Sequence, residues 1–142
     1  MNNRLKVFLL FAGFILFILG SLKCKDDITN FDISQIVFPA KNVSYHDHVE
    51  PIFLHVCAIP GGCHAGENPA GKLNPLNLET YEDFRQRLDI INFSTPENSR
   101  LILALKGRLP DVEQMPINRP KLNDNQINGM IIWIKEGVRG DN

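Results

Sequence analysis

The stretch Cys57-Ala-Ile-Pro-Gly-Gly-Cys63-His64 contains two of the three cysteines of the chain, and a histidine directly follows the second. Five residues separate the two thiols. The run Pro60-Gly61-Gly62 predicts a turn between them, and glycine adopts a positive φ at little cost. Two thiols and an imidazole this close together form a disulfide, bind a metal ion or attach a prosthetic group. The rest of the chain distinguishes between these chemistries.

The composition is that of an ordinary globular protein. The 142 residues are 44% hydrophobic and 22% charged, and the formal net charge is −1. A chain of this length accommodates one domain with short appendages. A net charge near zero gives no electrostatic basis for binding nucleic acid, so we expect no nucleic-acid partner.

The N-terminus has the pattern of an export signal. Arg4 and Lys6 precede an apolar run over residues 7–19, as in a secretory signal peptide. The run is shorter than the roughly 20 residues that span a bilayer comfortably. We therefore predict that residues 1–23 are a signal peptide or a membrane anchor.

Cys24 directly follows this region and resembles the lipid-acceptor cysteine of a bacterial lipoprotein. Three outcomes stay open: a lipidated Cys24, an uncleaved signal anchor, and simple secretion. The first two predict an exported, membrane-anchored protein that faces the periplasm or the cell exterior. Residues 24–43, which have scattered polar residues, Pro39 and little periodicity, would then be a tether. Thiols are oxidised outside the cytoplasm unless something occupies them, so Cys57 and Cys63 need a partner.

Residues 44–142 form the predicted domain, with about four short helices. The first starts at the N-cap Ser44 and ends at Cys57. The second is opened by Thr80 and the third by Thr95-Pro96. The last starts with a capping box at Asn123 and ends near Gly137. In each of the four helices the expected apolar positions recur at helical spacing. From the first helix to the last they are Tyr45, Val49, Ile52, Phe53 and Val56; Tyr81, Phe84, Leu88 and Ile91; Leu101, Ile102 and Leu105; and Ile127, Met130, Ile131 and Ile134.

No segment alternates in the manner of a strand, so the predicted fold class is all-α, with long loops. A domain of about one hundred residues buries a limited share of its surface. Long loops around so small a core indicate that a bound group fills the middle.

The adjacent Cys63 and His64 fit the logic of the Cys-x-x-Cys-His motif. In that motif two thiols bond the vinyl groups of a haem and the histidine binds its iron. The spacing differs here, since five residues instead of two separate the cysteines. Two alternatives stay open: a plain Cys57–Cys63 disulfide, and a structural zinc site completed by an upstream histidine.

Several segments together resemble small bacterial cytochrome c domains of the planctomycete-type group. In that group a helix with an "x-P-I-L/F" pattern leads into the haem cysteines, which are sometimes separated by extra residues. The similarity covers about residues 45–139. The matching segments are Val49-Glu50-Pro51-Ile52-Phe53, Cys57, Gly62-Cys63-His64, Ser99-Arg100-Leu101, Gln114-Met115-Pro116, Leu122 with Gln126-Ile127, and Trp133-Ile134-Lys135-Glu136-Gly137-Val138.

The resemblance implies a class I cytochrome c-like domain with one covalent haem c. It implies thioethers from Cys57 and Cys63, His64 as the proximal iron ligand and Met115 as the distal ligand. A methionine thioether on a loop, followed by Pro116, also suits an axial position that raises the reduction potential. We expect Met130 and Trp133 in the core, and the remaining histidines on the surface: His46, His48 and His55.

The expected function is one-electron transfer rather than catalysis, with redox proteins of the periplasm or membrane as partners. Two alternatives stay open. A haem-free lipoprotein with a Cys57–Cys63 disulfide would be an interaction module. A haem protein in which Met115 does not bind iron would have an open position, as in a haem enzyme or sensor.

Overall fold

The computed structural model describes residues 31–60, 62–66, 76–110 and 112–140. The chain divides into two units, residues 1–30 and 31–142. The predicted signal peptide or anchor at 1–23 and the predicted lipid acceptor Cys24 lie outside the described residues. In the described part of the chain, no helix is long and apolar enough to cross a membrane.

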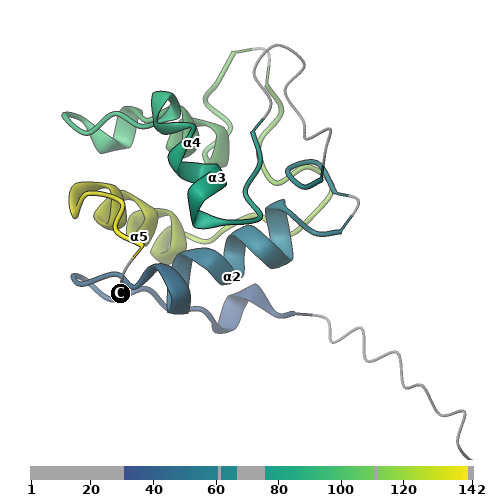
Figure 1. Cartoon of the computed structure of the whole chain (residues 1–142), viewed down its shortest axis with the longest axis horizontal. Helices are drawn as coiled ribbons and strands as arrows, with labels where there is room; N and C mark the ends of the chain where they lie inside the picture. The colour runs from purple at the N-terminus through teal and green to yellow at the C-terminus, as the bar shows by residue number, and fades with distance from the viewer. Residues whose placement is uncertain (1–30, 61, 67–75, 111, 141–142) are drawn as a thin grey trace, which may run out of the picture. The chain divides into compact units, whose positions relative to one another are not determined.

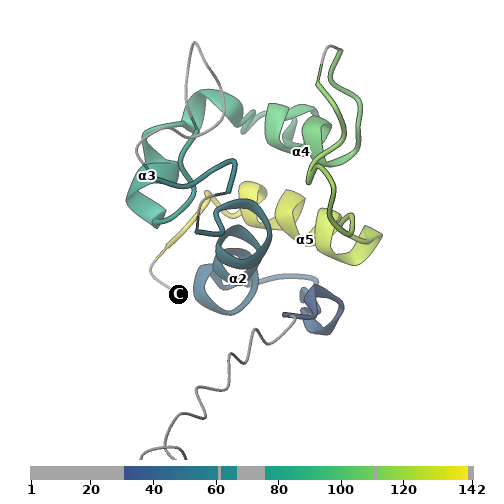
Figure 2. The ribbon, with the colours of Figure 1, turned by 90° about the vertical axis from the view of Figure 1, so that its right-hand side faces the viewer.

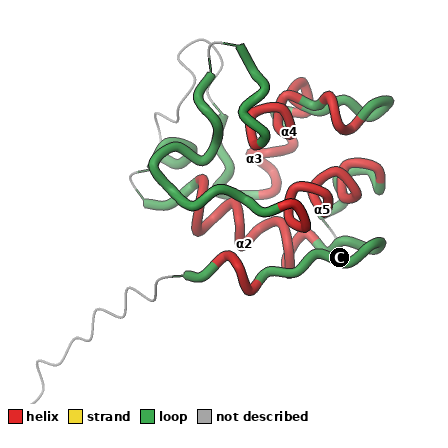
Figure 3. The backbone as a smooth tube through the Cα atoms, turned by 180° about the vertical axis from the view of Figure 1, so that it is seen from behind, coloured by secondary structure: helices red, strands yellow, loops and turns green. Residues whose placement is uncertain are grey.

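The described residues form helices joined by loops, with no strand among them (Figure 3). This confirms the predicted all-α class. In chain order, the elements are η1 (Ile33–Gln35), η2 (Tyr45–Val49), α2 (Glu50–Ile52), η3 (Phe53–Cys57), α3 (Tyr81–Arg85), η4 (Leu88–Ile90), η5 (Pro96–Asn98), α4 (Arg100–Leu105) and α5 (Asp124–Lys135).

The elements η2, α2 and η3 follow one another without a break. Together they correspond to the first predicted helix. Its start at Ser44 is confirmed, because the Ser44 hydroxyl accepts a hydrogen bond from the Asp47 amide at 3.1 Å. The first and last turns are wound as π-helix. The five apolar side chains predicted to share one face, Tyr45, Val49, Ile52, Phe53 and Val56, are all buried.

Helix α5 also begins and ends as predicted. The Asn123 side chain accepts from the Gln126 amide, and the Gln126 side chain accepts from the Asn123 amide, each at 3.0 Å. These two bonds satisfy amide groups that the helix itself leaves without partners. Gly137 has a φ of +89°, which allows the chain to leave the helix at this point.

The two middle helices are shorter than predicted. Thr80 caps α3 as expected, but the helix ends at Arg85, and Leu88 belongs to the separate turn η4. Thr95-Pro96 opens only η5, and α4 starts after Ser99. Ser99 is extended, with a ψ of 136°. Its buried hydroxyl accepts a hydrogen bond from the Asn92 amide at 2.9 Å, which joins the start of α4 to the preceding loop.

Trp133 of α5 lies at the centre of an aromatic core. Its ring centroid is 5.1 Å from that of Phe84, 5.9 Å from that of Tyr45 and 6.3 Å from that of Phe53. The indole N–H donates to the Arg139 carbonyl at 2.9 Å, so its one polar group is satisfied. Figures 1 and 2 show the helical stretch around α2 running beneath α3 and beside α5. The predicted core position of Trp133 is confirmed.

Residues 31–43 are part of the folded unit, so the prediction that the tether extends to residue 43 was wrong. Phe38 and Val43 are buried. The Asn125 side chain accepts from the Phe38 amide at 2.8 Å and donates to the Phe38 carbonyl at 3.1 Å. The Glu136 carboxylate accepts from the amides of Asn42 and Val43. These contacts attach the segment to α5.

Gly129 is the position on α5 against which Phe38 packs, since a Cβ added there would collide with the Phe38 ring. We predict that Gly129→Ala lowers the free energy of unfolding by about 1–3 kcal/mol, as overpacking does. Urea denaturation measures this change. Asn128→Ala, at an exposed position of the same helix, is the matched control and should stay within about 0.5 kcal/mol of wild type.

A Phe38→Ala background should remove most of the cost of Gly129→Ala, because the colliding ring is gone. If Gly129→Ala costs as much in that background as in the wild type, Phe38 does not pack on α5 as described.

Candidate functional site

A cavity of about 530 Å³ lies between η3, α4 and the loops that follow them. This volume is within the range of small-molecule and cofactor sites, about 300–1,000 Å³. Most of the wall is apolar, as expected for a site that holds a large hydrophobic ligand. The apolar part is formed by Val56, Ile59, Leu76, Leu78, Ile90, Leu101, Ala104, Leu105, Leu109, Val112, Pro116 and Ile117.

The four residues predicted to bind haem in the domain all lie on the wall of this one cavity. Cys57 is the last residue of η3, and Cys63 and His64 lie in the loop that follows. Met115 comes from the loop between α4 and α5. The structure thus brings together side chains that are more than fifty residues apart in the sequence.

The long gap between the cysteines is folded back on itself. The Gly62 amide donates to the Ile59 carbonyl at 2.7 Å, and the His64 amide donates to the Cys57 carbonyl at 3.2 Å. A Cβ at Gly62 would lie 2.6 Å from Ile59 Cγ1 and 2.8 Å from the Ile59 oxygen. Gly62 is therefore needed for close approach within the turn, whereas Gly61 lies outside the described residues.

The imidazole of His64 is held in one orientation. Its Nδ1 lies 3.0 Å from the Leu76 carbonyl oxygen. Since a carbonyl only accepts, Nδ1 carries the proton, and the neutral ring has its lone pair on Nε2. A second hydrogen bond, from the Leu78 amide to the His64 carbonyl at 2.9 Å, fixes the backbone. Metal-binding histidines have this arrangement, in which one nitrogen donates to a carbonyl and the other binds the metal.

The loop that contains Met115 is attached to the end of α4. The Met115 amide donates to the Ala104 carbonyl at 3.0 Å, and the Gln114 side chain donates to the Leu105 carbonyl at 2.9 Å. The Lys121 ammonium donates to the carbonyls of Gln114 and Pro116. The thioether of Met115, a soft neutral donor, is thereby positioned at the cavity wall.

Both cysteines are free thiols in the structure. Cys57 is half-buried and Cys63 is exposed. Removal from solvent raises the pKa of the Cys57 thiol to about 12, although the positive charge of Arg119 acts in the opposite direction. At neutral pH, Cys57 is therefore protonated. No disulfide joins Cys57 and Cys63 in the structure.

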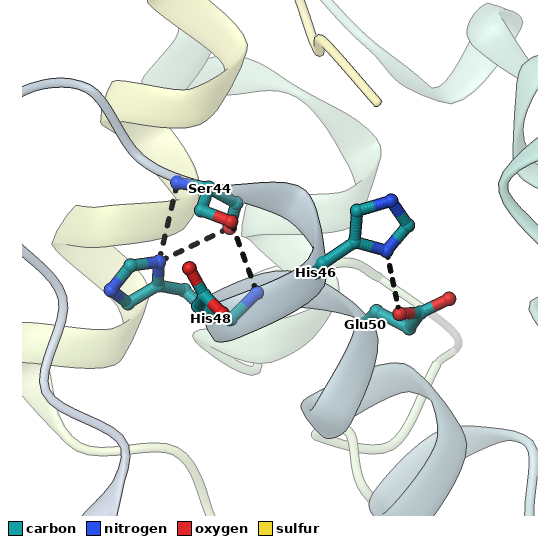
Figure 4. A network of polar contacts seen from close by, with 5 residues as sticks. Ser44, His46, His48 and Glu50 are labelled. Atoms are coloured by element: carbon teal, nitrogen blue, oxygen red, sulfur yellow. Dashed lines mark hydrogen bonds and ion pairs between the residues drawn. The ribbon is translucent and has the colours of Figure 1, made fainter. Parts of the chain in front are cut away.

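The upstream histidines have other partners and do not line the cavity. His46 lies 2.9 Å from the Glu50 carboxylate, and the His48 ring contacts the backbone of Ser44 (Figure 4). The ring of His55 stacks on that of Phe31 at 4.0 Å. Within the described ranges, no three His, Cys, Asp or Glu side chains could hold a metal ion together. The zinc alternative therefore has no ligand set in this part of the chain.

Met130 is fully buried on α5 and does not line the cavity, so its predicted place in the core is confirmed. Three charged residues of the cavity wall were not predicted as site residues from the sequence: Arg87, Arg100 and Arg119. Only Arg100 lies inside a matching motif, between Ser99 and Leu101. The other two come from loops whose approach to the cavity has no local sequence signal.

A scan against models of protein families and searches of curated proteins and of solved structures find no match for this chain. The site is therefore interpreted from its own geometry and chemistry.

The two thiols should differ in reactivity. Because burial raises the pKa of Cys57 to about 12, its thiolate fraction is lower in the folded chain. We therefore expect iodoacetamide at pH 8 to modify Cys57 at least about 100-fold more slowly in the folded than in the urea-unfolded chain. Exposed Cys63 is the internal control and should react readily in both states. Peptide mass spectrometry separates the two sites. Equal rates at Cys57 in the folded and unfolded chain would show that this thiol is not protected.

The same shift makes stability depend on pH. Because the pKa of Cys57 is higher in the folded than in the unfolded chain, its contribution is present below about pH 9 and is lost as the pH rises towards 12. The free energy of unfolding of wild type should therefore fall more steeply over this range than that of Cys57→Ala. If the free energy of unfolding falls equally steeply with pH in the two proteins, the raised pKa of Cys57 is contradicted.

Proposed function

We propose that this chain is a membrane-tethered c-type cytochrome domain that transfers single electrons through one covalent haem c. Its fold would be that of a small class I cytochrome c. The observation that carries this proposal is the presence of two thiols, an imidazole with Nε2 as its acceptor nitrogen, and a methionine thioether on the wall of one largely apolar cavity.

The residues that line the cavity suit a haem in both chemistry and position. An apolar macrocycle needs an apolar wall, and twelve of the lining side chains are apolar. Cys57 and Cys63 would hold the haem through thioethers, and His64 and Met115 would bind its iron. When bound, the haem supplies an iron ion that takes up and releases one electron.

The protein's own contribution is positioning and control of the reduction potential. The hydrogen bond from His64 Nδ1 to the Leu76 carbonyl leaves the lone pair of the ring on Nε2, where it would bind the iron, and increases the basicity of Nε2. The thioether of Met115 favours the reduced state and raises the potential. With His64 and Met115 both bound to the iron, no iron position would be left for a substrate, as expected for an electron carrier rather than an enzyme.

The proposed location and partners follow from the N-terminal pattern. The folded unit begins at Phe31, so residues 25–30 alone would connect it to a lipid on Cys24. Such a carrier would exchange electrons with redox proteins of the periplasm or of the same membrane.

Lipidation is tested by labelling with radioactive fatty acid. The wild-type chain should incorporate label, and Cys24→Ala should not. Cys63→Ala, which removes a thiol of the folded unit, is the control and should keep the label. An unlabelled wild type would exclude Cys24 as the acceptor.

The ligand assignment is tested with two Met→Leu variants made with haem-attachment machinery. We predict that Met115→Leu abolishes the methionine-to-iron absorption band of the oxidised protein and lowers its reduction potential, because the thioether is lost. Met130→Leu, a change of similar volume in the core, should keep both. A band that survives Met115→Leu, or is absent from wild type, would refute the assignment of Met115.

A further inference from the structure

The loop that contains Met115 is attached to α4 on the side that precedes Met115. The Met115 amide donates to the Ala104 carbonyl at 3.0 Å, and the Gln114 side chain donates to the Leu105 carbonyl at 2.9 Å. The chain leaves α4 at Gly107, which has a φ of +63°, and a Cβ added there would lie 2.9 Å from the Gln114 Cβ. These contacts hold one end of the loop against the helix.

On the other side of Met115 the loop is held by the side chain of Lys121. The chain reverses at Asn118, which has a φ of +54°. Beyond this turn the Lys121 ammonium reaches back, donating to the Gln114 carbonyl at 2.7 Å and also to the Pro116 carbonyl. An ammonium has three donors and no acceptor, so it suits a pair of carbonyl oxygens. The two residues that it binds flank Met115 in the sequence.

The backbone of Lys121 is itself fixed to α5. Leu122, the next residue, is buried in the core, and Asn123 caps α5 through the reciprocal hydrogen bonds with Gln126. The ammonium is therefore held by a part of the chain that cannot shift without disturbing the start of α5. Met115 is thus fixed between the end of α4 and the beginning of α5, whose connection can be followed in Figure 2.

The two attachments differ in how they can be removed. The bonds to α4 include backbone groups, whereas the attachment on the other side depends on one exposed side chain, Lys121. Hydrogen bonds from a charged donor are stronger than those between neutral groups. Loss of the ammonium would leave Met115 attached on the α4 side, so the loop would open more often while the core stays packed.

Resting on the proposed function, we propose that Lys121 is the positioning residue that keeps the Met115 thioether on the iron and thereby keeps outside ligands off it. Lys121 does not line the cavity, so it acts through the backbone on either side of Met115. Its hydrogen bonds would make the domain an electron carrier with a closed iron rather than a haem protein with an open position.

The first test is a titration of the oxidised, haem-loaded protein with imidazole, followed by loss of the methionine-to-iron absorption band. Imidazole binds the iron only when Met115 has left it, so its apparent affinity rises with the fraction of open loop. Lys121→Leu removes charge-assisted hydrogen bonds, so we expect the apparent affinity to rise by about tenfold or more.

Two further variants separate positioning from charge. Lys121→Arg keeps a cation with several N–H donors and should restore most of the resistance to imidazole. Lys106→Leu is the matched control, because it makes the same substitution at the C-cap of α4, where no side-chain bond to the Met115 loop is recorded among the described residues. Its affinity for imidazole should equal that of wild type.

The second test is hydrogen exchange of the Met115 amide, measured by NMR on the full chain. This amide should exchange about tenfold faster in Lys121→Leu than in wild type, because the loop opens more often. The Val138 amide, which donates to the Trp133 carbonyl at 3.0 Å in the aromatic core, is the internal control and should exchange at the wild-type rate.

The proposal is overturned if Lys121→Leu binds imidazole no more tightly than wild type, or if Lys106→Leu has the same effect. It is also overturned if the amides of Met115 and Val138 accelerate equally, since the whole domain would then have loosened. In these cases the proposed function stands. A wild type without haem, or without the absorption band, would instead contradict the proposed function, and the exchange of Met115 would still show whether Lys121 holds the loop.

Discussion

The packing of Trp133 against Tyr45, Phe53 and Phe84 is the constraint on which the rest of the fold depends, because it joins the first helical stretch, α3 and α5. No residue of α5 lines the cavity. The core is therefore divided into an aromatic part around α5 and a cavity bounded by η3, α4 and loops. A domain this small gains limited stability from its side chains alone, so a large bound group in the cavity would complete its core.

The candidate ligands are positioned by hydrogen bonds to the backbone of loops rather than by helices. The His64 ring and backbone are fixed by Leu76 and Leu78, and Met115 is fixed by Ala104. Loops held in this way position the His64 imidazole and the Met115 thioether on the cavity wall and leave space between the two side chains. In the proposed cytochrome, the haem would occupy that space.

The sequence predicted the elements with strong local signals, namely the caps at Ser44, Thr80 and Asn123 and the apolar faces of the first and last helices. It did not predict the start of α4, which depends on the contact between Ser99 and Asn92. It was also wrong about residues 31–43, because Phe38 and Val43 show no periodicity and are buried only by contact with α5. In the site, Cys57, Cys63, His64 and Met115 were found through motifs, whereas the approach of Arg87 and Arg119 is a property of the tertiary structure.

The most direct test of the central claim is the mass of the chain after expression with haem-attachment machinery and complete denaturation. The account predicts the mass of the chain plus one haem, and a single peptide in which both Cys57 and Cys63 are linked to that haem. A haem on Cys63 alone would limit the claim to one thioether. A colourless chain with a Cys57–Cys63 bridge would contradict the account.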